Sequence, residues 1–384
     1  MNEIQALLES FDALKSESKG TALASIVKVK GSAYRRPGAR MLIAPDGRTV
    51  GSISAGCLDR DVCERAQKVI ASGAPVVATY DTTGAGDDVW GLGLGCAGLV
   101  EILIEPLGQD APANHVLTFL GERFARRDVG VVVTVFRSDG AATAKIGSRL
   151  MLTGNGEVFS TLEDPRLVEM LADEAKQALQ VGRSRTKEIA LQDGMVEALL
   201  EVILPSLPLV IFGAGDDAMP LARLAKEIGW HVTVADSRSG YATSERFPSA
   251  DRILVVRPEA AMQSVQVDDR TAAVVMTHNY AQDLELLKLL LPSAVRYLGI
   301  LGARNRTAVM LRTLKGQVPG LREHHLERVY SPIGLDIGAE TPGEIALAIL
   351  AEIRAVTTGR AASFLRDRRG PIHDVIDAGQ SPVG

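Results

Sequence analysis

An internal repeat with a spacing of 109 residues runs through the first half of this 384-residue chain. At that spacing glycines align with glycines and an arginine aligns with an arginine. The matched pairs are Gly31 with Gly140, Gly38 with Gly147, Arg40 with Arg149, Gly47 with Gly156 and Gly73 with Gly182. Because self-similarity at a fixed period marks a repeated structural unit, residues 20–107 and 129–206 are expected to be two copies of one fold.

Both copies contain the same series of predicted elements. An alternating apolar strand leads to a second strand, a turn, a helix that ends at a glycine and a closing strand. These elements are residues 22–29, 40–44, 46–47, 58–70 and 99–104 in the first copy, and 131–136, 149–153, 155–156, 167–179 and 199–204 in the second. Together they predict an α+β domain over residues 1–206, built from two tandem repeats.

The closing strands match at a spacing of 100 residues, because Val100-Glu101 aligns with Leu200-Glu201. By this alignment the second copy lacks about nine residues from the region of residues 83–98, so its fold closes without them. That region holds one of two segments in which glycines precede a cysteine, GLGLGCAG at residues 91–98. The other is GSISAGC at residues 51–57, and its cysteine aligns with Arg166 in the second copy.

Cys57 and Cys96 are therefore candidate functional thiols, with Gly56 and Gly95 allowing a ligand to approach them. Cys57 lies just before a predicted helix, where the unpaired amides and the helix dipole favour a thiolate that could act as a nucleophile or as a ligand of a soft metal. Both cysteines are expected to face one cavity.

Three residues that follow Cys57 are assigned structural roles. Asp59 and Asp61 are expected to cap the helix as carboxylates of its first turn. Cys63 is expected to be an inert core residue, since it shares a helical face with Ala66 and Ile70.

A basic loop separates the first two predicted strands, at residues 30–40. Arg35 and Arg36 could hold a phosphate, because arginine offers a fork of donors and the neighbouring glycines admit a close approach. A solvated loop is the alternative. Arg40 is expected to be structural, because the second copy keeps it as Arg149.

From residue 207 strands and helices alternate, which predicts a Rossmann-like, doubly wound parallel sheet over residues 207–360. Gly213 and Gly215 follow a buried strand and precede a helix, and Asp236 ends the next strand. This pattern is typical of dinucleotide binding, with the acid accepting from a ribose hydroxyl. Asp216 and Asp217 weigh against ordinary NAD use, because they bring negative charge to the place of the phosphates.

Polar residues also follow later strands of this predicted sheet. His278, Arg304 and Arg306 could converge on a ligand, because the carboxyl ends of parallel strands line one crevice. A structural histidine is the alternative for His278. Residues 341–344 (TPGE) have the pattern of a capped helix start, and residues 361–384 are expected to form a loose tail.

Composition limits the class of protein. The net charge is −5, so no basic surface points to nucleic acid or an anionic membrane. Apolar runs fall short of a membrane span, and the first twenty residues do not resemble a secretion signal. We therefore expect a cytoplasmic protein whose three cysteines are reduced thiols.

Five ordered segments resemble the XdhC/CoxI family, the maturation factors of xanthine dehydrogenase and carbon monoxide dehydrogenase. They are GSISAGCLD (51–59), GLGLGCAGLVEILIEP (91–106), LVIFGAGDDAMPLARLAKEIGWHVTVAD (209–236), YLGILGARNR (297–306) and PIGLDIGAETPGEIALAILAE (332–352). The sequence departs from the family at Ala55, where a second glycine is usual, and at Asp59-Arg60, where Glu-Gly is common.

This resemblance implies a cofactor-binding chaperone rather than a turnover enzyme. It would bind molybdenum cofactor, in the plain or the cytidine-linked form, assist its sulfuration by a cysteine desulfurase and deliver it to an apo molybdenum hydroxylase. Cys57 and Cys96 would contact the molybdenum or carry sulfur to it. The pterin and its phosphate would be held by residues drawn from both domains: Arg35, Arg36, Gly56, Gly95, Gly213, Gly215, Asp236, His278 and Arg304.

Two other functions stay open on the sequence. One is an NAD(P)-dependent oxidoreductase that uses Gly213, Gly215 and Asp236, with His278 as its proton donor. The other is a carrier of metal or sulfur that uses the two thiols without a pterin. The client enzyme and the formation of a homodimer stay open as well.

Overall fold

The structure is a computed structural model that describes residues 3–16, 20–31, 33–54, 56, 58–81, 98–108, 112–140, 144–191, 194–318 and 320–369. The chain divides into two compact units, Glu3–Pro205 and Ser206–Arg368. The predictions for Cys57, Gly95, Cys96 and residues 370–384 lie outside the described residues.

In the first unit each repeat forms an antiparallel sheet, and the two sheets have the same strand order. The first sheet is ordered β3-β2-β1-β5-β4 and the second β8-β7-β6-β10-β9. The strands of the first are β1 (Thr21–Gly31), β2 (Arg40–Ile43), β3 (Thr49–Gly51), β4 (Val76–Asp81) and β5 (Gly98–Leu107). Those of the second are β6 (Gly130–Gly140), β7 (Arg149–Thr153), β8 (Val158–Ser160), β9 (Arg185–Leu191) and β10 (Gly194–Ile203). The predicted repeat is thereby confirmed, with two edge strands per copy that the sequence had not indicated.

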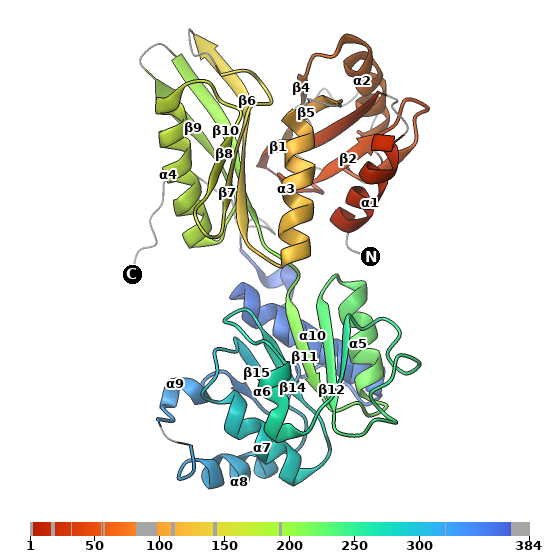
Figure 1. Ribbon diagram of the computed structural model, residues 1–384, viewed down its shortest axis with the longest axis vertical. Helices are drawn as coiled ribbons and strands as arrows, with labels where there is room; N and C mark the ends of the chain where they lie inside the picture. The colour runs from red at the N-terminus through yellow and green to blue at the C-terminus, as the bar shows by residue number, and fades with distance from the viewer. Residues whose placement is uncertain are drawn as a thin grey trace. The chain divides into compact units, whose positions relative to one another are not determined.

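Helices cover the outer faces of these two sheets (Figure 1). Helix α2 (Asp59–Ser72) packs on the first sheet and α4 (Pro165–Val181) on the second. Both end as predicted, at Gly73 and Gly182, whose φ angles of 70° and 68° favour a residue without a Cβ atom. The inner faces pack together, with α1 (Glu3–Ser16) and α3 (Pro112–Arg126) contributing to the same core.

Strand register corrects the predicted alignment of the closing strands. Gly98 pairs with Gly31 in the first sheet and Gly194 pairs with Gly140 in the second, so the spacing is 96 residues and not 100. Each closing strand carries two glutamates four residues apart. A shift of four residues therefore keeps the same alternation of faces. For this reason the sequence comparison aligned the two closing strands four residues out of register. The extra residues of the first copy all fall in the β4–β5 connection, residues 82–97, whereas residues 192–193 alone join β9 to β10.

Two buried ion pairs join the repeats, and they are equivalent in position. Arg40 Nη1 donates to Glu201 Oε1 at 2.8 Å and to the Gly38 carbonyl oxygen at 2.8 Å. Arg149 makes the same two contacts with Glu105 and Gly147. A Cβ atom on Gly38 would lie 2.8 Å from the Glu201 carboxylate. A glycine at this position therefore leaves room for the Glu201 side chain of the second repeat. The structural role predicted for Arg40 is confirmed.

A β-bulge at the same position of β1 and β6 brings further charges between the sheets. The pairing with the closing strands shifts next to Lys28 in one copy and next to Arg137 in the other. Arg137 donates to Glu101 at 2.6 Å and to Glu197 at 2.9 Å, and Lys28 also pairs with Glu197. Because a bulge turns successive side chains to one face, both cations reach across to the other sheet.

The second unit is a parallel sheet ordered β13-β12-β11-β14-β15-β16. Its strands are β11 (Pro208–Phe212), β12 (His231–Asp236), β13 (Arg252–Val255), β14 (Ala272–Val275), β15 (Tyr297–Ile300) and β16 (Val329–Tyr330). Helices α5 and α10 pack on one face and α6, α7 and α8 on the other (Figure 1). This arrangement confirms the predicted Rossmann-like, doubly wound fold.

Helical segments connect most of the strands of this unit and follow the last one, and η3 lies in the segment that was expected to be a loose tail. They are α5 (Ala218–Glu227), η2 (Pro258–Ala260), α6 (Ala261–Ser264), α7 (Tyr280–Leu290), α8 (Arg304–Leu314), α9 (Glu323–Leu326), α10 (Pro342–Thr358) and η3 (Leu365–Asp367). Thr341 and Glu344 form the predicted capping box of α10. Among the described residues, no helix has the length and apolar character needed to cross a bilayer.

Candidate functional site

Several candidate residues lie at one end of the first sheet. The end of β1 pairs with the start of β5 through Gly31 and Gly98, and the β1–β2 connection leaves from the same end. The half-buried Arg35 and Arg36 lie in that connection. Strand β3 is antiparallel to β2 and also runs toward this end, where the segment that contains Gly56 follows. The backbone thus brings the basic loop, Gly56 and the ends of the β4–β5 connection to the same end of the first sheet.

A hydrogen-bond network centred on Ser54 orders the segment before α2. The Ser54 hydroxyl donates to Asp59 Oδ1 at 2.6 Å and accepts from the amides of Leu58 (3.0 Å) and Gly56 (3.2 Å). The Ser54 amide also donates to Asp59 Oδ1, at 3.1 Å. This network fixes the backbone on both sides of position 57.

The helix-capping role predicted for Asp59 and Asp61 is wrong. Leu58 is the N-cap residue of α2, and its side chain makes no capping hydrogen bond. Asp59 instead binds Ser54, while Asp61 accepts from Arg65 at 2.7 Å and from the Tyr80 hydroxyl at 2.5 Å. Both carboxylates lie in the first turn of α2, but their hydrogen bonds go to Ser54, Arg65 and Tyr80 and not to the helix amides.

Gly56 lies next to this network. It is exposed, its φ angle is 101°, and a Cβ atom there would meet no atom of the residues that the structure describes within 4 Å. The glycine thus allows a backbone conformation that residues with a side chain rarely adopt. Cys63, by contrast, packs partly against the core, and burial together with the Asp59 charge raises the pKa of its thiol. Its expected inert role agrees with this environment.

The second candidate region is the carboxyl end of the parallel sheet, around the glycine turn after β11. A Cβ atom on Gly213 would lie 2.4 Å from the Met276 carbonyl oxygen, so this glycine allows β11 and β14 to end close together. A Cβ atom on Gly215 would lie 2.6 Å from Asp217 Oδ1. The space left by the second glycine is therefore occupied by the protein's own carboxylate.

Asp236, the acid of the sequence fingerprint, is buried and fully engaged. It accepts hydrogen bonds from the Ala214 amide (2.7 Å) and from the Arg238 amide (2.8 Å), Nε (3.0 Å) and Nη2 (2.8 Å). Burial raises the pKa of Asp236, but the hydrogen bonds from Arg238 and Ala214 outweigh it and hold this pKa below its usual range. The Asp236 carboxylate therefore has a structural role: it joins the glycine turn to the segment that follows β12.

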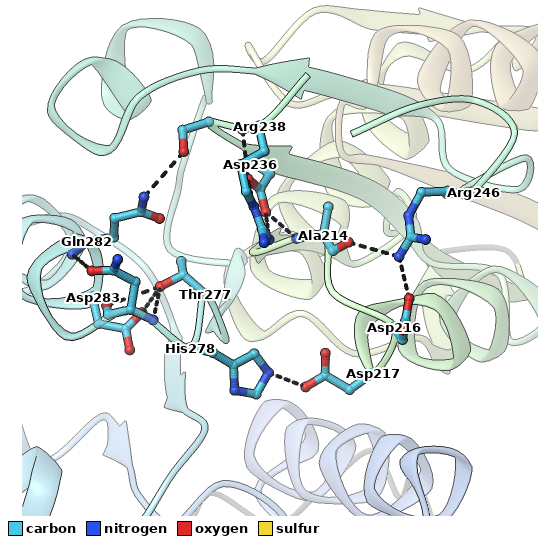
Figure 2. Close-up of polar contacts among 12 residues, drawn as sticks. Ala214, Asp216, Asp217, Asp236, Arg238, Arg246, Thr277, His278, Gln282 and Asp283 are labelled. Carbon is cyan, nitrogen blue, oxygen red and sulfur yellow. Dashed lines mark hydrogen bonds and ion pairs between the residues drawn. The ribbon is translucent and has the colours of Figure 1, made fainter. Parts of the chain in front are cut away.

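Two further acid–base contacts lie at the turn (Figure 2), and a third lies close by, at the start of α7. His278 Nε2 lies 2.7 Å from Asp217 Oδ2, and Arg246 Nη2 lies 2.7 Å from Asp216 Oδ1. The buried Asp283 accepts from Thr277 at 2.5 Å and from Arg306 at 2.6 Å. His278 has a φ angle of 58°, an uncommon backbone conformation for a residue with a side chain.

The residues that were expected to converge on a ligand have different partners in the structure. His278 reaches the glycine turn, whereas Arg306 is directed to the buried Asp283. Arg304 is exposed and begins α8. Of the predicted group, only His278 is joined by a described contact to the turn that contains Gly215.

The geometry of this turn does not fit a dinucleotide. A pyrophosphate would approach Gly215 and the start of α5, where Asp217 lies. A ribose hydroxyl would need an acceptor at Asp236, whose oxygens already accept four protein donors. Neither requirement of NAD binding is met.

Two family matches cover most of the chain. Residues 209–353 match the family described as the XdhC Rossmann domain. Residues 14–81 and 124–190, one segment in each repeat, match the XdhC and CoxI family. The chain belongs to the XdhC and CoxI family. The resemblance expected from the sequence is thus confirmed.

Relatives and a solved structure agree with this membership. A Bacillus subtilis protein described as a probable subunit of xanthine dehydrogenase is 35% identical over 346 residues, 89% of this chain and 94% of the relative. The Escherichia coli molybdenum cofactor insertion chaperone PaoD is 24% identical over 339 residues, 88% of this chain and 84% of the relative. A Bacillus halodurans crystal structure, described as that of a xanthine dehydrogenase, has a TM-score of 0.75 at 29% identity and covers 94% of this chain and 97% of its own.

Sequence reasoning missed several side chains of these two regions. Ser54 gave no signal beyond its place in a glycine-bearing segment. The approach of His278 to Asp217 joins residues 61 positions apart, and no sequence rule pairs them. Arg238 could have been noticed, because it lies two residues after the end of β12.

Proposed function

We propose that this protein is a maturation factor that binds molybdenum cofactor, assists its sulfuration by a cysteine desulfurase and delivers it to an apo molybdenum hydroxylase. The hydroxylase would be of the xanthine dehydrogenase or carbon monoxide dehydrogenase type, and the work would take place in the cytoplasm. Support comes from the family and from the relative named as a molybdenum cofactor insertion chaperone.

The difference between the two repeats carries the proposal. Equivalent hairpins join β4 to β5 and β9 to β10, yet the first connection spans residues 82–97 and the second residues 192–193. The longer connection contains Cys96 and its glycines. A segment that one copy has and the other folds without is not needed for the scaffold, so we assign it to cofactor binding.

The described residues at this end of the first sheet suit an anionic cofactor whose metal binds thiolates. Arg35 and Arg36 would supply positive charge for the phosphate, and Gly56, which is exposed among the described residues, would allow the cofactor to approach. Cys57 and Cys96 would hold the molybdenum, since thiolates are ligands that soft metal centres prefer. The bound cofactor would supply the metal centre that the hydroxylase needs, while this chain binds and orients it.

Cofactor retention tests the proposal. Protein purified from a molybdenum-replete host should carry molybdenum and pterin, measured by elemental analysis and by pterin fluorescence after oxidation. Cys57→Ser and Cys96→Ser should each lose most of both signals. Cys63→Ser is the matched control, because its side chain packs against the core, and it should retain them.

Other outcomes separate the alternatives. Undiminished retention in Cys57→Ser would remove this thiol from the site. Metal without pterin would instead favour a thiol carrier of metal or sulfur. A sulfuration assay with a cysteine desulfurase and an apo hydroxylase then tests delivery, since activation of the hydroxylase should depend on Cys57.

A further inference from the structure

We propose that Asp61 and Arg65, held in place by Tyr80, bind the hydrogen-bonding edge of the pterin ring at the cofactor site of the first repeat. The proposal rests on the maturation function and deepens it, because it names the side chains that recognise the organic part of the cofactor. These side chains are distinct from the arginines assigned to the phosphate and from the thiols assigned to the metal.

A cluster of three polar side chains joins the start of α2 to the end of β4. Asp61 Oδ2 accepts hydrogen bonds from the Tyr80 hydroxyl at 2.5 Å and from Arg65 Nε at 2.7 Å. The Arg65 guanidinium carbon lies 5.8 Å from the centroid of the Tyr80 ring, and this ring packs against the core of the first sheet. The tyrosine therefore fixes the ion pair from the side of the sheet.

The second repeat folds without this cluster. At the spacing of 109 residues, the positions of Asp61, Arg65 and Tyr80 are taken in the second copy by Met170, Glu174 and Ile189. Ile189 packs in the core of the second sheet, and the Met170 side chain is largely exposed. Because the equivalent helix and strand pack together with an apolar residue at two of the three positions, the scaffold does not require the cluster.

The cluster lies at the end of the first sheet to which the cofactor is assigned. Tyr80 comes one residue before the end of β4, where the connection of residues 82–97 begins, and Asp61 lies in the first turn of α2. In the sheet, β5 lies between β4 and β1, the strand from which the arginine-bearing connection leaves. Two strand spacings amount to about 10 Å. This separation suits the fused rings of a pyranopterin, whose phosphate and pterin edge lie at opposite ends.

The accessible atoms of the ion pair match the edge of a pterin. That edge presents a carbonyl oxygen, a ring N–H and an amino group side by side. Among the described residues, no hydrogen bond uses Asp61 Oδ1 or the two Nη atoms of Arg65. The two side chains are 35% and 40% exposed, so a ligand can reach them. Asp61 Oδ1 would accept from the amino group or the ring N–H, while an Arg65 Nη atom donates to the carbonyl oxygen.

The surroundings of Asp61 keep it ionised for this role. Burial raises the pKa of Asp61, but the hydrogen bonds from Tyr80 and Arg65 outweigh burial and hold this pKa below its usual range. Burial and the bond to Asp61 also raise the pKa of Tyr80, so its hydroxyl stays a donor. With both of these donors on Oδ2, the carboxylate keeps Oδ1 as an acceptor for a ligand.

A pair of free pteridines tests this contact on the full-length protein, purified without cofactor. The probes are hydroxymethylpterin and hydroxymethyllumazine, which carry an amino group and an oxo group, respectively, at the same ring carbon. Titration followed by pteridine fluorescence should give at least about tenfold tighter binding of the pterin, because the oxo group of the lumazine would face the Asp61 carboxylate. Equal affinity for the two probes would overturn the proposal, as would absence of pterin binding at millimolar concentration.

Variants of Asp61 separate recognition from folding. Asp61→Asn keeps the size of the side chain and should abolish the preference for the pterin. Asp61→Met with Tyr80→Ile introduces the residues of the second repeat, so this variant should unfold at a temperature close to that of the parent and also lose the preference. Glu64→Gln is the matched control, because Arg60 and Glu64 form an exposed pair with the same spacing on the same helix. Parental preference in both Asp61 variants would contradict the assignment.

Cofactor retention distinguishes failure of this proposal from failure of the maturation function. A parent protein that carries neither molybdenum nor pterin after growth in a molybdenum-replete host would contradict the maturation function. A parent that carries both, with an Asp61→Asn variant that retains both at the parental level, would refute the pterin contact alone. Cys57→Ser should lose the cofactor and still prefer the free pterin over the lumazine, because Asp61 and Arg65 are unchanged in it.

Discussion

Asp236 stabilises the parallel sheet as a carboxylate, because it accepts from Ala214 and Arg238 and its pKa is held below the usual range. Asp236→Asn should lower the free energy of unfolding at pH 7 by about 2 kcal/mol. A group with a lowered folded pKa contributes stability above its unfolded pKa and loses it as the pH falls through the folded value. The difference between parent and variant should therefore shrink below about pH 4.

Urea unfolding measured at several pH values checks this, with the fluorescence of Trp230 as the probe in a Trp90→Phe background. Asp269→Asn, which changes an exposed carboxylate of the same unit, serves as the control and should have little effect at any pH. A deficit in Asp236→Asn that stays constant down to pH 3 would show that the carboxylate charge is not involved.

His278 has a left-handed backbone conformation, with a φ angle of 58°. His278→Gly should be more stable than His278→Ala by about 1 kcal/mol, because only glycine adopts this conformation without steric cost. Both variants lose the contact with Asp217, so their difference reports the backbone alone. At Lys288, inside α7, the order should reverse, with glycine the less stable by about 1 kcal/mol. Equal stability of the two His278 variants would contradict the assigned strain.

At the level of elements, the equivalent helices α2 and α4 start in different ways. Asp164 caps α4 by accepting from the Arg166 amide, whereas Asp59 holds the segment before α2 through Ser54. Asp164→Ala should cost about 1 kcal/mol. Asp59→Ala should cost about 1–2 kcal/mol, because hydrogen bonds to a charged group are lost.

Amide hydrogen exchange separates the two effects. Asp59→Ala should speed exchange at Gly56 and Leu58, since the Ser54 hydroxyl that accepts from them loses its own acceptor. Asp164→Ala should speed exchange in the first turn of α4 and leave Gly56 and Leu58 unchanged. Unaltered exchange at both amides in Asp59→Ala would exclude the proposed ordering of this segment.

Some elements could be predicted from sequence and others could not. The helix ends at Gly73 and Gly182 and the capping box at Thr341 have local causes, so short sequence patterns report them. Strands β3 and β8 have three residues each and lie at sheet edges, where few side chains are buried. Without a buried face there is no apolar alternation, and the sequence gives no strand signal.

For the molecule as a whole, the two repeats depend on each other through buried charges. Glu201→Gln leaves Arg40 without its carboxylate, and removing one partner of a buried ion pair costs about 3–5 kcal/mol. Replacing both partners, as Arg40→Met with Glu201→Leu, should recover most of that loss, because no unpaired charge stays buried. Arg149 and Glu105 should behave alike, because they occupy the equivalent positions.

Thermal and urea unfolding of the Glu201→Gln variant and of the double variant measure these effects. Lys145→Gln with Glu163→Gln removes an exposed ion pair of the second repeat and is the control, with an expected change below about 1 kcal/mol. A double variant as unstable as the Glu201→Gln variant would show that the pair itself, and not the unpaired charge, determines stability.

These contacts between the repeats explain why some features of the whole molecule could not be predicted from the sequence. The repeat showed that Arg40 is structural, yet its partner lies 161 residues away in the other copy. The same holds for the glycine turn of the second unit, where the fingerprint was complete but Asp217 and Arg238 occupy the positions a dinucleotide would need. Local sequence patterns predicted the strands and helices. The side chains that fill a site or leave it open depend on contacts between residues far apart in the sequence, so these patterns did not predict them.

The unequal hairpins of the two repeats have a consequence for protein engineering. Since Gln192-Asp193 joins β9 to β10 in the sheet equivalent to that of β4 and β5, the same dipeptide is a natural replacement for residues 82–97. A chimera of this kind would be a loop-free scaffold with an intact core, on which the missing segment could be supplied as a separate peptide. The second repeat thus provides, inside the same polypeptide, a template for a version of the first repeat with a short hairpin.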